Sequence, residues 1–299
     1  MSNNKRRFFL RYISLIQKLK NKPASFEEIQ AHLKRQSRET SEDLSISKRT
    51  FQRDLNDILD IFKINIEFEN SKGYFISDGG EPGFMTRMLE NFDQLDLLYR
   101  TKNPSQYIYY ERRKPSGTEH FYGILHAIYK RVLISFRHEK FWEDSVTFRT
   151  VEPLAIKESQ HRWYLIAKDR KDKVIKTFGL DRISEIIIEQ EKFEFPNNFD
   201  VNEMFENSYG VITDKGKPKE IILSFEPEQR KYLGSLQIHN SQEVIVDNAN
   251  EYRIKLKMHV TIDLIKEILS YGENVEVITP ASLRNNIRGR YKKALHYYS

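Results

Sequence analysis

The chain has 299 residues and a mass of 35.7 kDa, which exceeds what one ordinary hydrophobic core holds, so we expect two or three domains. With 39% hydrophobic and 31% charged residues and no apolar run of membrane-spanning length, the composition excludes a disordered chain and an integral membrane protein. The absence of cysteine excludes disulfides, thiolate metal sites and cysteine nucleophiles. A formal net charge of +6 favours an anionic partner, and the N-terminus shows no apolar export segment, so we expect a cytoplasmic protein.

Three helices are predicted at the start of the chain. Apolar residues at spacings of three and four predict a helix over residues 5–20. Ser25 and Glu28 have the spacing of a capping box, which predicts that a second helix begins there. Ser47 is the expected N-cap of a third helix with a clear apolar stripe.

The segments around these helices are also predicted. Residues 36–46 form a polar stretch between the second and third helices. Alternating apolar residues on both sides of a turn predict a β-hairpin over residues 64–76. Residues 77–83, rich in glycine, predict a linker, and residues 84–101 an amphipathic helix. A domain boundary is therefore expected near residue 80.

The rest of the chain has the pattern of two small domains. Five short segments with strand character follow a short helix before residue 190, which predicts a small barrel. After residue 195 the order strand, helix, strand, strand, helix, strand is that of a ferredoxin-like unit, in which the first strand is predicted over residues 219–225 and the second helix over residues 262–270. The expected fold class is multidomain α+β. The predicted parts are an N-terminal domain (1–80), a linker helix and connector (81–118), a barrel (119–192) and a C-terminal α+β extension expected to dimerise (193–299).

The first two turns of the third helix carry basic and polar residues that cannot belong to the core. A third helix of this kind before a hairpin is typical of a winged helix-turn-helix, whose recognition helix enters the major groove of DNA. A lysine at the hairpin tip is placed to contact a backbone phosphate. The alternative is that the basic helix face is simply solvated. The predicted DNA-binding residues are Ser47, Lys48, Arg49, Thr50, Gln52, Arg53 and Lys72.

Several segments resemble one known family. Residues 47–55 (SKRTFQRDL) resemble the recognition-helix signature of bacterial WYL-domain transcriptional regulators. Residues 161–167 (HRWYLIA) contain the Trp-Tyr-Leu triplet that names the family, between residues 151–154 (VEPL) and 178–183 (FGLDRI). Three further segments, 236–242, 270–277 and 280–284, are similar to the family's C-terminal extension. The resemblance covers almost the whole chain.

The resemblance implies an N-terminal winged helix-turn-helix, a central Sm/SH3-like barrel and a C-terminal extension. It also implies that the barrel senses a negatively charged ligand, which would be a nucleotide, an oligonucleotide or single-stranded DNA. Members of the family often lie beside phage-defence genes, so a role in phage-defence control is a further implication.

Ligand-binding residues are expected near the triplet. Strand alternation places Tyr164 and Lys168 on one face, expected to be open, where a phenol ring and an ammonium group can stack on and pair with a nucleotide. Arg149 and Arg182 are expected to converge on a ligand phosphate. The alternative is that Arg182 pairs with Asp181 or a backbone carbonyl and that Tyr164 is core. The complete predicted set is Arg149, Tyr164, Lys168, Arg182, Arg137 and His138.

No enzyme motif is found in the sequence. It contains no phosphate-binding glycine loop, no nucleophile elbow and no histidine pair at metal-binding spacing, so no catalytic, cofactor or metal-binding residue is predicted. We expect a homodimeric transcriptional regulator, a repressor, that binds double-stranded operator DNA and responds to an anionic nucleotide or oligonucleotide effector at the barrel. The alternative is a single-stranded nucleic-acid-binding module that uses the small barrel as its main site.

Overall fold

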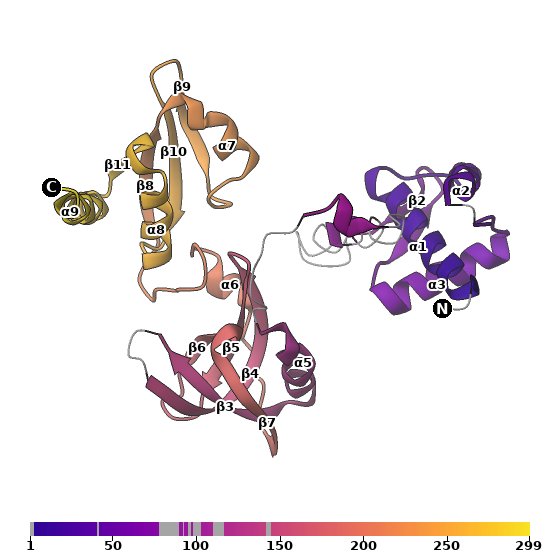
Figure 1. Ribbon diagram of the computed structural model, residues 1–299, viewed down its shortest axis with the longest axis horizontal. Helices are drawn as coiled ribbons and strands as arrows, with labels where there is room; N and C mark the ends of the chain where they lie inside the picture. Colours follow the sequence, from indigo (N-terminus) through magenta and orange to yellow (C-terminus); the bar gives the residue numbers. More distant parts are fainter. Residues whose placement is uncertain are drawn as a thin grey trace. The chain divides into compact units, whose positions relative to one another are not determined.

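The computed structural model describes residues 3–40, 42–77, 103–109, 117–141 and 145–299, together with residues 90, 91, 93, 94 and 97. The chain divides into two compact units, Met1–Arg112 and Arg113–Ser299 (Figure 1). Most of the predicted connecting helix over residues 84–101 lies outside the described residues. Among the described residues, no helix combines the length and the apolar character needed to cross a membrane.

The first unit consists of three helices followed by a hairpin. The capping box predicted before the second helix is present, because the Ser25 N–H donates to Glu28 Oε2 at 2.8 Å and the Glu28 N–H donates to Ser25 Oγ at 3.2 Å. Ser47 caps the third helix as predicted, its hydroxyl oxygen accepting from the Thr50 N–H at 3.1 Å. The elements are α1 (Asn3–Asn21), α2 (Phe26–Thr40), α3 (Lys48–Phe62), the antiparallel strands β1 (Ile66–Glu69) and β2 (Gly73–Ile76), and the 3-10 helix η1 (Pro104–Gln106).

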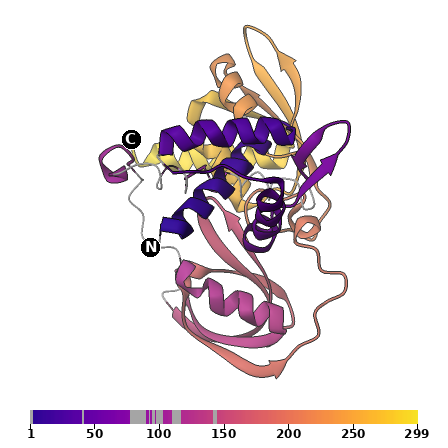
Figure 2. The ribbon, with the colours of Figure 1, turned by 90° about the vertical axis from the view of Figure 1, so that its right-hand side faces the viewer.

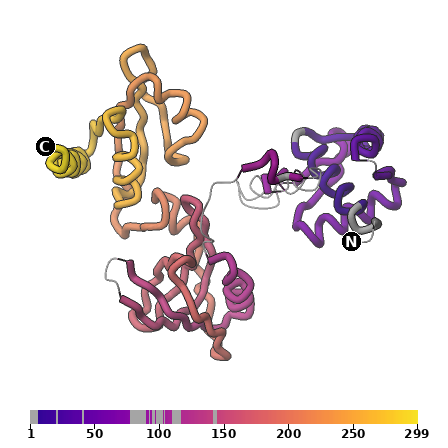
Figure 3. Tube along the Cα trace, viewed as in Figure 1, coloured from indigo at the N-terminus to yellow at the C-terminus, as the bar shows by residue number. Residues whose placement is uncertain are grey.

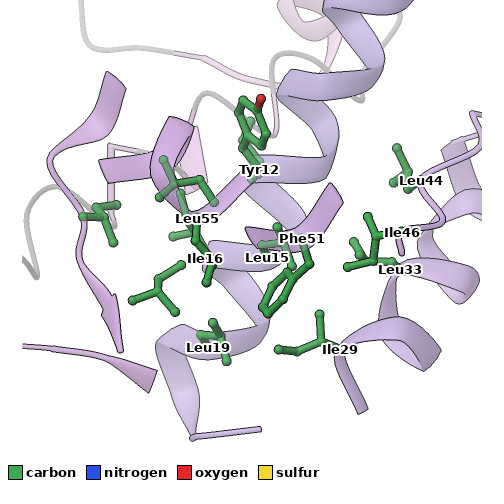
Figure 4. Close-up of a cluster of buried hydrophobic side chains, with 14 of the residues drawn as sticks. Tyr12, Leu15, Ile16, Leu19, Ile29, Leu33, Leu44, Ile46, Phe51 and Leu55 are labelled. Atoms are coloured by element: carbon green, nitrogen blue, oxygen red, sulfur yellow. The ribbon is translucent and has the colours of Figure 1, made fainter. Parts of the chain in front are cut away.

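One hydrophobic core joins the three helices and the hairpin. Phe51 of α3 stands edge-on to Tyr74 of β2, with ring centroids 4.8 Å apart. The hairpin also bonds to the turn after α1, where Ala24 and Tyr74 form a β-bridge. Gly73 makes this approach possible, because it has a φ of +86° and a Cβ there would lie 2.6 Å from the Ala24 carbonyl oxygen. Figure 4 shows side chains of this core from the three helices and from the loop before α3, with labels on Tyr12, Leu15, Ile16, Leu19, Ile29, Leu33, Leu44, Ile46, Phe51 and Leu55.

The connection predicted over residues 36–46 is shorter in the structure. Helix α2 continues to Thr40, because most of these residues are good helix formers. The loop that follows is anchored, since Leu44 and Ile46 are buried in the core and the Leu44 N–H donates to Ser37 Oγ at 2.9 Å. The segment is therefore part of the folded unit and carries its own core residues.

The second unit begins with a helix against a curved, fully antiparallel sheet, visible in Figure 1 and Figure 2. The strand order is β6-β5-β4-β3-β7, which leaves β6 and β7 at the two edges. Leu165 and Ala167 point into the core between sheet and helix, as the alternation around the triplet predicts, and Trp163 packs against that core. The elements are η2 (Thr118–His120), α5 (Phe121–Lys130), β3 (Val132–Lys140), β4 (Ser145–Ser159), β5 (Arg162–Asp169), β6 (Ile175–Gly179), η3 (Leu180–Arg182) and β7 (Ile183–Lys192).

A second sheet with the order β11-β8-β10-β9 follows, and Figure 3 traces the chain through it to the last helix. Helices α7 and α8 both contribute side chains to one core with this sheet, through Leu233 and through Leu264 and Ile268. The elements are α6 (Val201–Phe205), β8 (Lys219–Phe225), η4 (Pro227–Gln229), α7 (Arg230–Ser235), β9 (Glu243–Asp247), β10 (Tyr252–Met258), α8 (Ile262–Ser270), η5 (Gly272–Asn274), β11 (Val275–Thr279) and α9 (Ala281–His296). The chain is thus a multidomain α+β protein, as predicted.

Candidate functional site

The outer face of the first two turns of α3 is polar and exposed. Lys48, Arg49, Gln52 and Arg53 are all exposed, whereas Phe51 on the opposite side is buried. None of the three cations forms an ion pair with a carboxylate in the part of the chain that the structure describes. Their charges are therefore available to an anionic partner.

Aromatic rings support two of these cations. Lys48 Nζ lies 5.8 Å from the centroid of the Phe26 ring, and the Arg53 guanidinium lies 5.8 Å from that of Phe8. The predicted residues Ser47 and Thr50 have a different role, because their hydroxyl oxygens lie 3.0 Å apart at the helix N-terminus. They close the first turn of α3 while the basic side chains project from it.

A buried ion pair fixes α3 against α1. Arg11 Nε lies 2.6 Å from Asp54 Oδ2, and Arg11 Nη2 lies 2.7 Å from Asp54 Oδ1. The Arg11 side chain is 3% exposed and that of Asp54 0%, so this bidentate pair is almost completely dehydrated. One turn further along α3, the Tyr12 hydroxyl donates to Asp57 at 2.5 Å, and burial followed by this bond raises the pKa of Tyr12. These contacts set the rotation of α3 and hence the direction of its basic face.

The Arg11–Asp54 pair was not predicted, although the sequence contains a signal for it. Arg11 lies three residues after Phe8 on the apolar face of α1, and Asp54 lies three residues after Phe51 on the apolar face of α3. A single opposite charge on each of two apolar faces indicates a buried pair.

The hairpin forms one wall of a groove beside α3. The groove has a volume of about 590 Å³ and brings Lys48 and Gln52 of α3 to the same surface as Lys72 and Phe68. Lys72 donates to Glu69 Oε2 at 2.8 Å, and both side chains remain exposed. Because exposed pairs of this kind are weak, a phosphate can replace the carboxylate as the partner of Lys72.

A second polar site lies at one end of the five-stranded sheet. A pocket of about 480 Å³ is lined by His138, Lys140, Arg149 and Lys176. Burial, and then the charges of Arg182, Arg149 and Lys140, lower the pKa of His138 to about 4, so the ring is neutral at physiological pH. Its Nε2 atom is buried and has no hydrogen-bond partner among the described residues. The pocket therefore combines several positive charges with an unused ring nitrogen.

Asp169 holds two of the pocket's cations. Its Oδ2 atom lies 3.0 Å from Arg149 Nη1 and 2.8 Å from Lys176 Nζ, and Lys176 also pairs with the exposed Asp172. Burial disfavours ionisation of Asp169, but the hydrogen bonds from Lys176 and from the Lys171 N–H, with the two neighbouring charges, outweigh it and lower the pKa of Asp169. The carboxylate is thus charged and partly neutralises the pocket.

The opposite wall of the pocket comes from the chain that follows the five-stranded sheet. Met204, Val211 and Thr213 line this wall. The Val211 N–H donates to Asp263 Oδ2 of α8 at 3.2 Å, and the Thr177 hydroxyl donates to the Val211 carbonyl oxygen at 3.4 Å. Strand β6 and helix α8 therefore both contribute to the position of this wall.

The predicted ligand residues divide into two groups. His138 and Arg149 line the pocket, and Arg182 lies beside it, with its guanidinium 5.1 Å from the Phe141 ring centroid and its Nε 3.9 Å from Asp181 Oδ1. The others do not line it. Arg137 faces Glu185 at 3.4 Å, Lys168 lies 3.7 Å from Glu152, and Tyr164 is half-buried, with a pKa that burial raises.

Strand register explains this division. Arg149 pairs with Phe136, and Lys176 pairs with Ala167, so both cations lie on the core face of the sheet at its end. Tyr164 and Lys168 lie on the other face, which was expected to hold the ligand and which is closed at Ile166. Lys140 and Lys176 were not predicted. Alternation shows which residues share a face of a strand, but it does not show that the core face borders a pocket at the end of the sheet.

Comparison with known proteins supplies two domain assignments. The model of the WYL domain matches residues 119–188, and the model of the WCX domain matches residues 217–295. Protein PafB of Mycobacterium tuberculosis and of Mycobacterium bovis is 24% identical over 197 residues, covering 59% of this chain and 53% of the relative. The chain therefore spans about half the length of these curated relatives.

Two solved structures show a weak overall likeness. Proteasome accessory factor B/C (PafBC) of Arthrobacter aurescens has a TM-score of 0.36 at 20% identity, covering 94% of this chain and 45% of that one. A CRISPR Cas-related protein has a TM-score of 0.41 at 11% identity, covering 98% and 85%. The two domain matches confirm the family resemblance. The chain belongs to the WYL-domain family and carries a WYL domain at residues 119–188 followed by a WCX domain at residues 217–295.

Proposed function

We propose that the protein is a DNA-binding transcriptional regulator whose first unit is a winged helix-turn-helix. The observation that carries this proposal is the exposed basic face at the start of α3, which has no ion-pair partner among the described residues and lies opposite a fully packed core face. A helix of this kind fits the major groove with its leading turns toward the base edges. Arg49 is the proposed base-reading residue, Lys48, Gln52 and Arg53 its neighbours, and Lys72 the proposed phosphate contact.

The strand order and the order of elements in the second unit also support this proposal. The strand order β7-β3-β4-β5-β6, with one helix packed on the sheet, fits a small Sm/SH3-like barrel. The order of elements from β8 to β11 fits a ferredoxin-like unit. We assign these folds to the WYL and WCX domains.

The Arg49→Ala variant tests the DNA-binding face. Loss of a bidentate contact to a base should cost about 1–3 kcal/mol of affinity for a specific duplex and relax the sequence preference. Lys72→Ala should weaken specific and scrambled duplexes equally and reduce the salt dependence. Affinities are measured at fixed salt on a duplex that the wild-type chain selects from a random pool. Equal losses on both duplexes for Arg49→Ala would contradict base reading.

We propose that the WYL pocket binds an anionic nucleotide or oligonucleotide and that the ligand changes the affinity for operator DNA. A volume of about 480 Å³ suits a small ligand of this class, and four basic or imidazole side chains line it. The ligand needs only to favour one of two states of the DNA-binding units by about 1–3 kcal/mol. The proposed direction of regulation is repression.

Arg182→Ala tests the ligand response. We expect the variant to bind duplex DNA like the wild type but to lose the change in affinity caused by a 5′-phosphorylated dinucleotide. Fluorescence anisotropy of the labelled duplex, with and without the dinucleotide, measures both quantities. An unchanged response would leave Arg182 with the structural role that its position beside Asp181 also allows.

We further propose a cytoplasmic homodimer that has no catalytic activity and acts in phage-defence control. Two half-sites give a small DNA-binding domain useful specificity, which favours a dimer. One available surface is the edge strand β9, where Val244 and Ile245 are exposed. The other is the predicted helix 84–101, most of which lies outside the described residues. Light scattering of the Val244→Asp variant tests the first surface, because a monomer is the expected result.

The second candidate function is a single-stranded nucleic-acid-binding module centred on the WYL pocket. The cluster of His138, Arg149 and Lys176 favours it independently of α3. Combined replacement of Arg49 and Arg53 by alanine separates the two functions. Loss of duplex binding with unchanged single-strand binding supports two distinct sites, whereas duplex binding that survives both changes removes α3 as the recognition helix.

A further inference from the structure

The last helix of the chain, α9, carries an unusual charge. Residues 281–296 contain five lysines and arginines and no aspartate or glutamate. Only Leu283 and Ile287 of this helix are buried. Neither the domain assignments nor the proposed function assigns a role to this surface.

A groove lies between α9 and the free edge of the sheet at β11. Its volume is about 640 Å³, and apolar side chains, including Val277, Ile287 and Leu295, form much of its lining. Arg284, Arg288 and Lys292 also line it and recur every four residues. In an α-helix this spacing makes one continuous row with a rise of about 6 Å between members. The groove therefore has an apolar floor and a basic row along one side.

Two tyrosines complete the groove. Tyr291 belongs to its lining, and its hydroxyl donates to the Gly272 carbonyl oxygen at 2.8 Å, which fixes the ring. Tyr298 also lines the groove but is 89% exposed. Arg284 is engaged by Glu276, whereas Arg288 and Lys292 form no ion pair with any residue that the structure describes. The free charges and the aromatic rings thus lie along the same surface.

We propose that the groove between α9 and β11 is a binding site for single-stranded nucleic acid. Arg288 and Lys292 bind backbone phosphates, while the rings of Tyr291 and Tyr298 stack on bases. A duplex encloses its bases and would leave these rings unused, so the aromatic residues favour a single strand. Its residues are distinct from those of the DNA-binding face of α3 and from those that line the WYL pocket, so the proposal does not depend on either.

Charge argues against a second copy of the chain as the occupant. In a two-fold symmetric contact centred on α9, the basic row of one helix would face the same row of its partner. Such like charges repel and disfavour the contact. A single-stranded polyanion can pair its phosphates with the basic row and place its bases against the apolar floor.

Neighbouring residues of the same type provide a matched test. Lys292 and Tyr298 line the groove, whereas Lys293 and Tyr297 do not, and Tyr297 is equally exposed at 85%. The variants are therefore Lys292→Ala with Tyr298→Ala, and Lys293→Ala with Tyr297→Ala, which remove the same groups. The probe is fluorescein-labelled oligodeoxythymidylate of about 12 nucleotides, a length within the usual range of single-strand sites. Anisotropy titrations of the full chain give the affinity, and light scattering gives the oligomeric state.

We expect the groove variant to lose about tenfold or more in affinity and the control variant to stay within about twofold of the wild type. The slope of log affinity against log salt should fall by about 0.7 for the lost lysine contact. Equal losses in both variants would mean undirected electrostatic attraction and would overturn the proposal. It would also be overturned if the groove variant became monomeric with unchanged affinity for the oligonucleotide, since the groove would then be a contact between copies.

Discussion

Replacing Asp54 with alanine should lower the free energy of unfolding of the first unit by about 3–5 kcal/mol. The variant leaves the Arg11 guanidinium without a partner in a place where only 3% of its side chain reaches solvent. Desolvation of an unpaired charge is expensive, and the bidentate hydrogen bonds that offset it in the wild type are lost. Because α3 is fixed to α1 through this pair, we expect the affinity for duplex DNA to fall as well.

The measurement must separate the two units. Both tryptophans, Trp142 and Trp163, belong to the second unit, so tryptophan fluorescence reports that unit alone. Hydrogen exchange of peptides from α1 and α3 reports the first unit. We expect faster exchange in these peptides at an unchanged fluorescence transition in urea. A shift of the fluorescence transition instead would contradict the local origin of the effect.

Two further variants show that the loss comes from an unpaired buried charge. Asp57→Ala removes a carboxylate from the same helix, where its partner Tyr12 is neutral, and should cost about 1 kcal/mol. Arg11→Met combined with Asp54→Leu removes both charges and should recover most of the stability. If the double variant is as unstable as Asp54→Ala, the loss of stability does not come from the unpaired charge of Arg11 alone.

Local patterns account for the elements that the sequence predicts well. The helix predicted over residues 262–270 and the strand predicted over residues 219–225 have the bounds of α8 and β8. Both are short segments with a regular apolar period and clear ends, such as the Thr261 cap of α8. The hairpin is likewise predicted by its turn residues.

The ligand pocket shows what local patterns cannot supply. The residues that line it come from β3, β4 and β6 and from the chain after α6, and only the strand register brings them together. Arg149 and Tyr164 were predicted to share one site because Arg149 precedes the Trp-Tyr-Leu triplet that contains Tyr164. The register separates them onto opposite faces of the sheet. The register between neighbouring strands cannot be predicted from the alternation of residues within one strand.

The groove beside α9 could be predicted from the sequence only in part. The sequence contains its charge, five basic residues without an acidic one in residues 281–296. It does not show that β11 is an edge strand, which follows from the sheet order. The positive charge of α9 can therefore be predicted from the sequence. The groove in which that charge lies depends on the order of the strands in the sheet.

Replacing Asp169 with asparagine should destabilise the second unit and at the same time strengthen anion binding. Asp169 is 1% exposed and pairs with Arg149 and Lys176, both of them pocket residues. Loss of its charge leaves two partly buried cations less well compensated, which should cost about 2–3 kcal/mol in the free energy of unfolding. The same loss removes a negative charge that competes with the ligand, so we expect an affinity for a 5′-phosphorylated dinucleotide about tenfold higher.

Acid should reduce the difference in stability between this variant and the wild type. The pKa of Asp169 is lowered in the folded state, so its charge contributes stability above the ordinary carboxyl pKa of about 4. That contribution is lost as the pH falls through the lowered value. The wild type should therefore lose stability in acid, and the two unfolding curves should approach each other there.

Asp172→Asn is the matched control for both effects. It removes the same charge from the other carboxylate that pairs with Lys176, but Asp172 is exposed, so we expect little change in stability and a smaller gain in affinity. Tryptophan fluorescence in urea measures the stability of the second unit, since the ring centroids of Trp163 and Phe121 lie 4.8 Å apart at its core. Titration calorimetry measures the affinity for the dinucleotide. If Asp169→Asn binds the dinucleotide more weakly than the wild type, the carboxylate orients Arg149 and Lys176 for the ligand and does not compete with it.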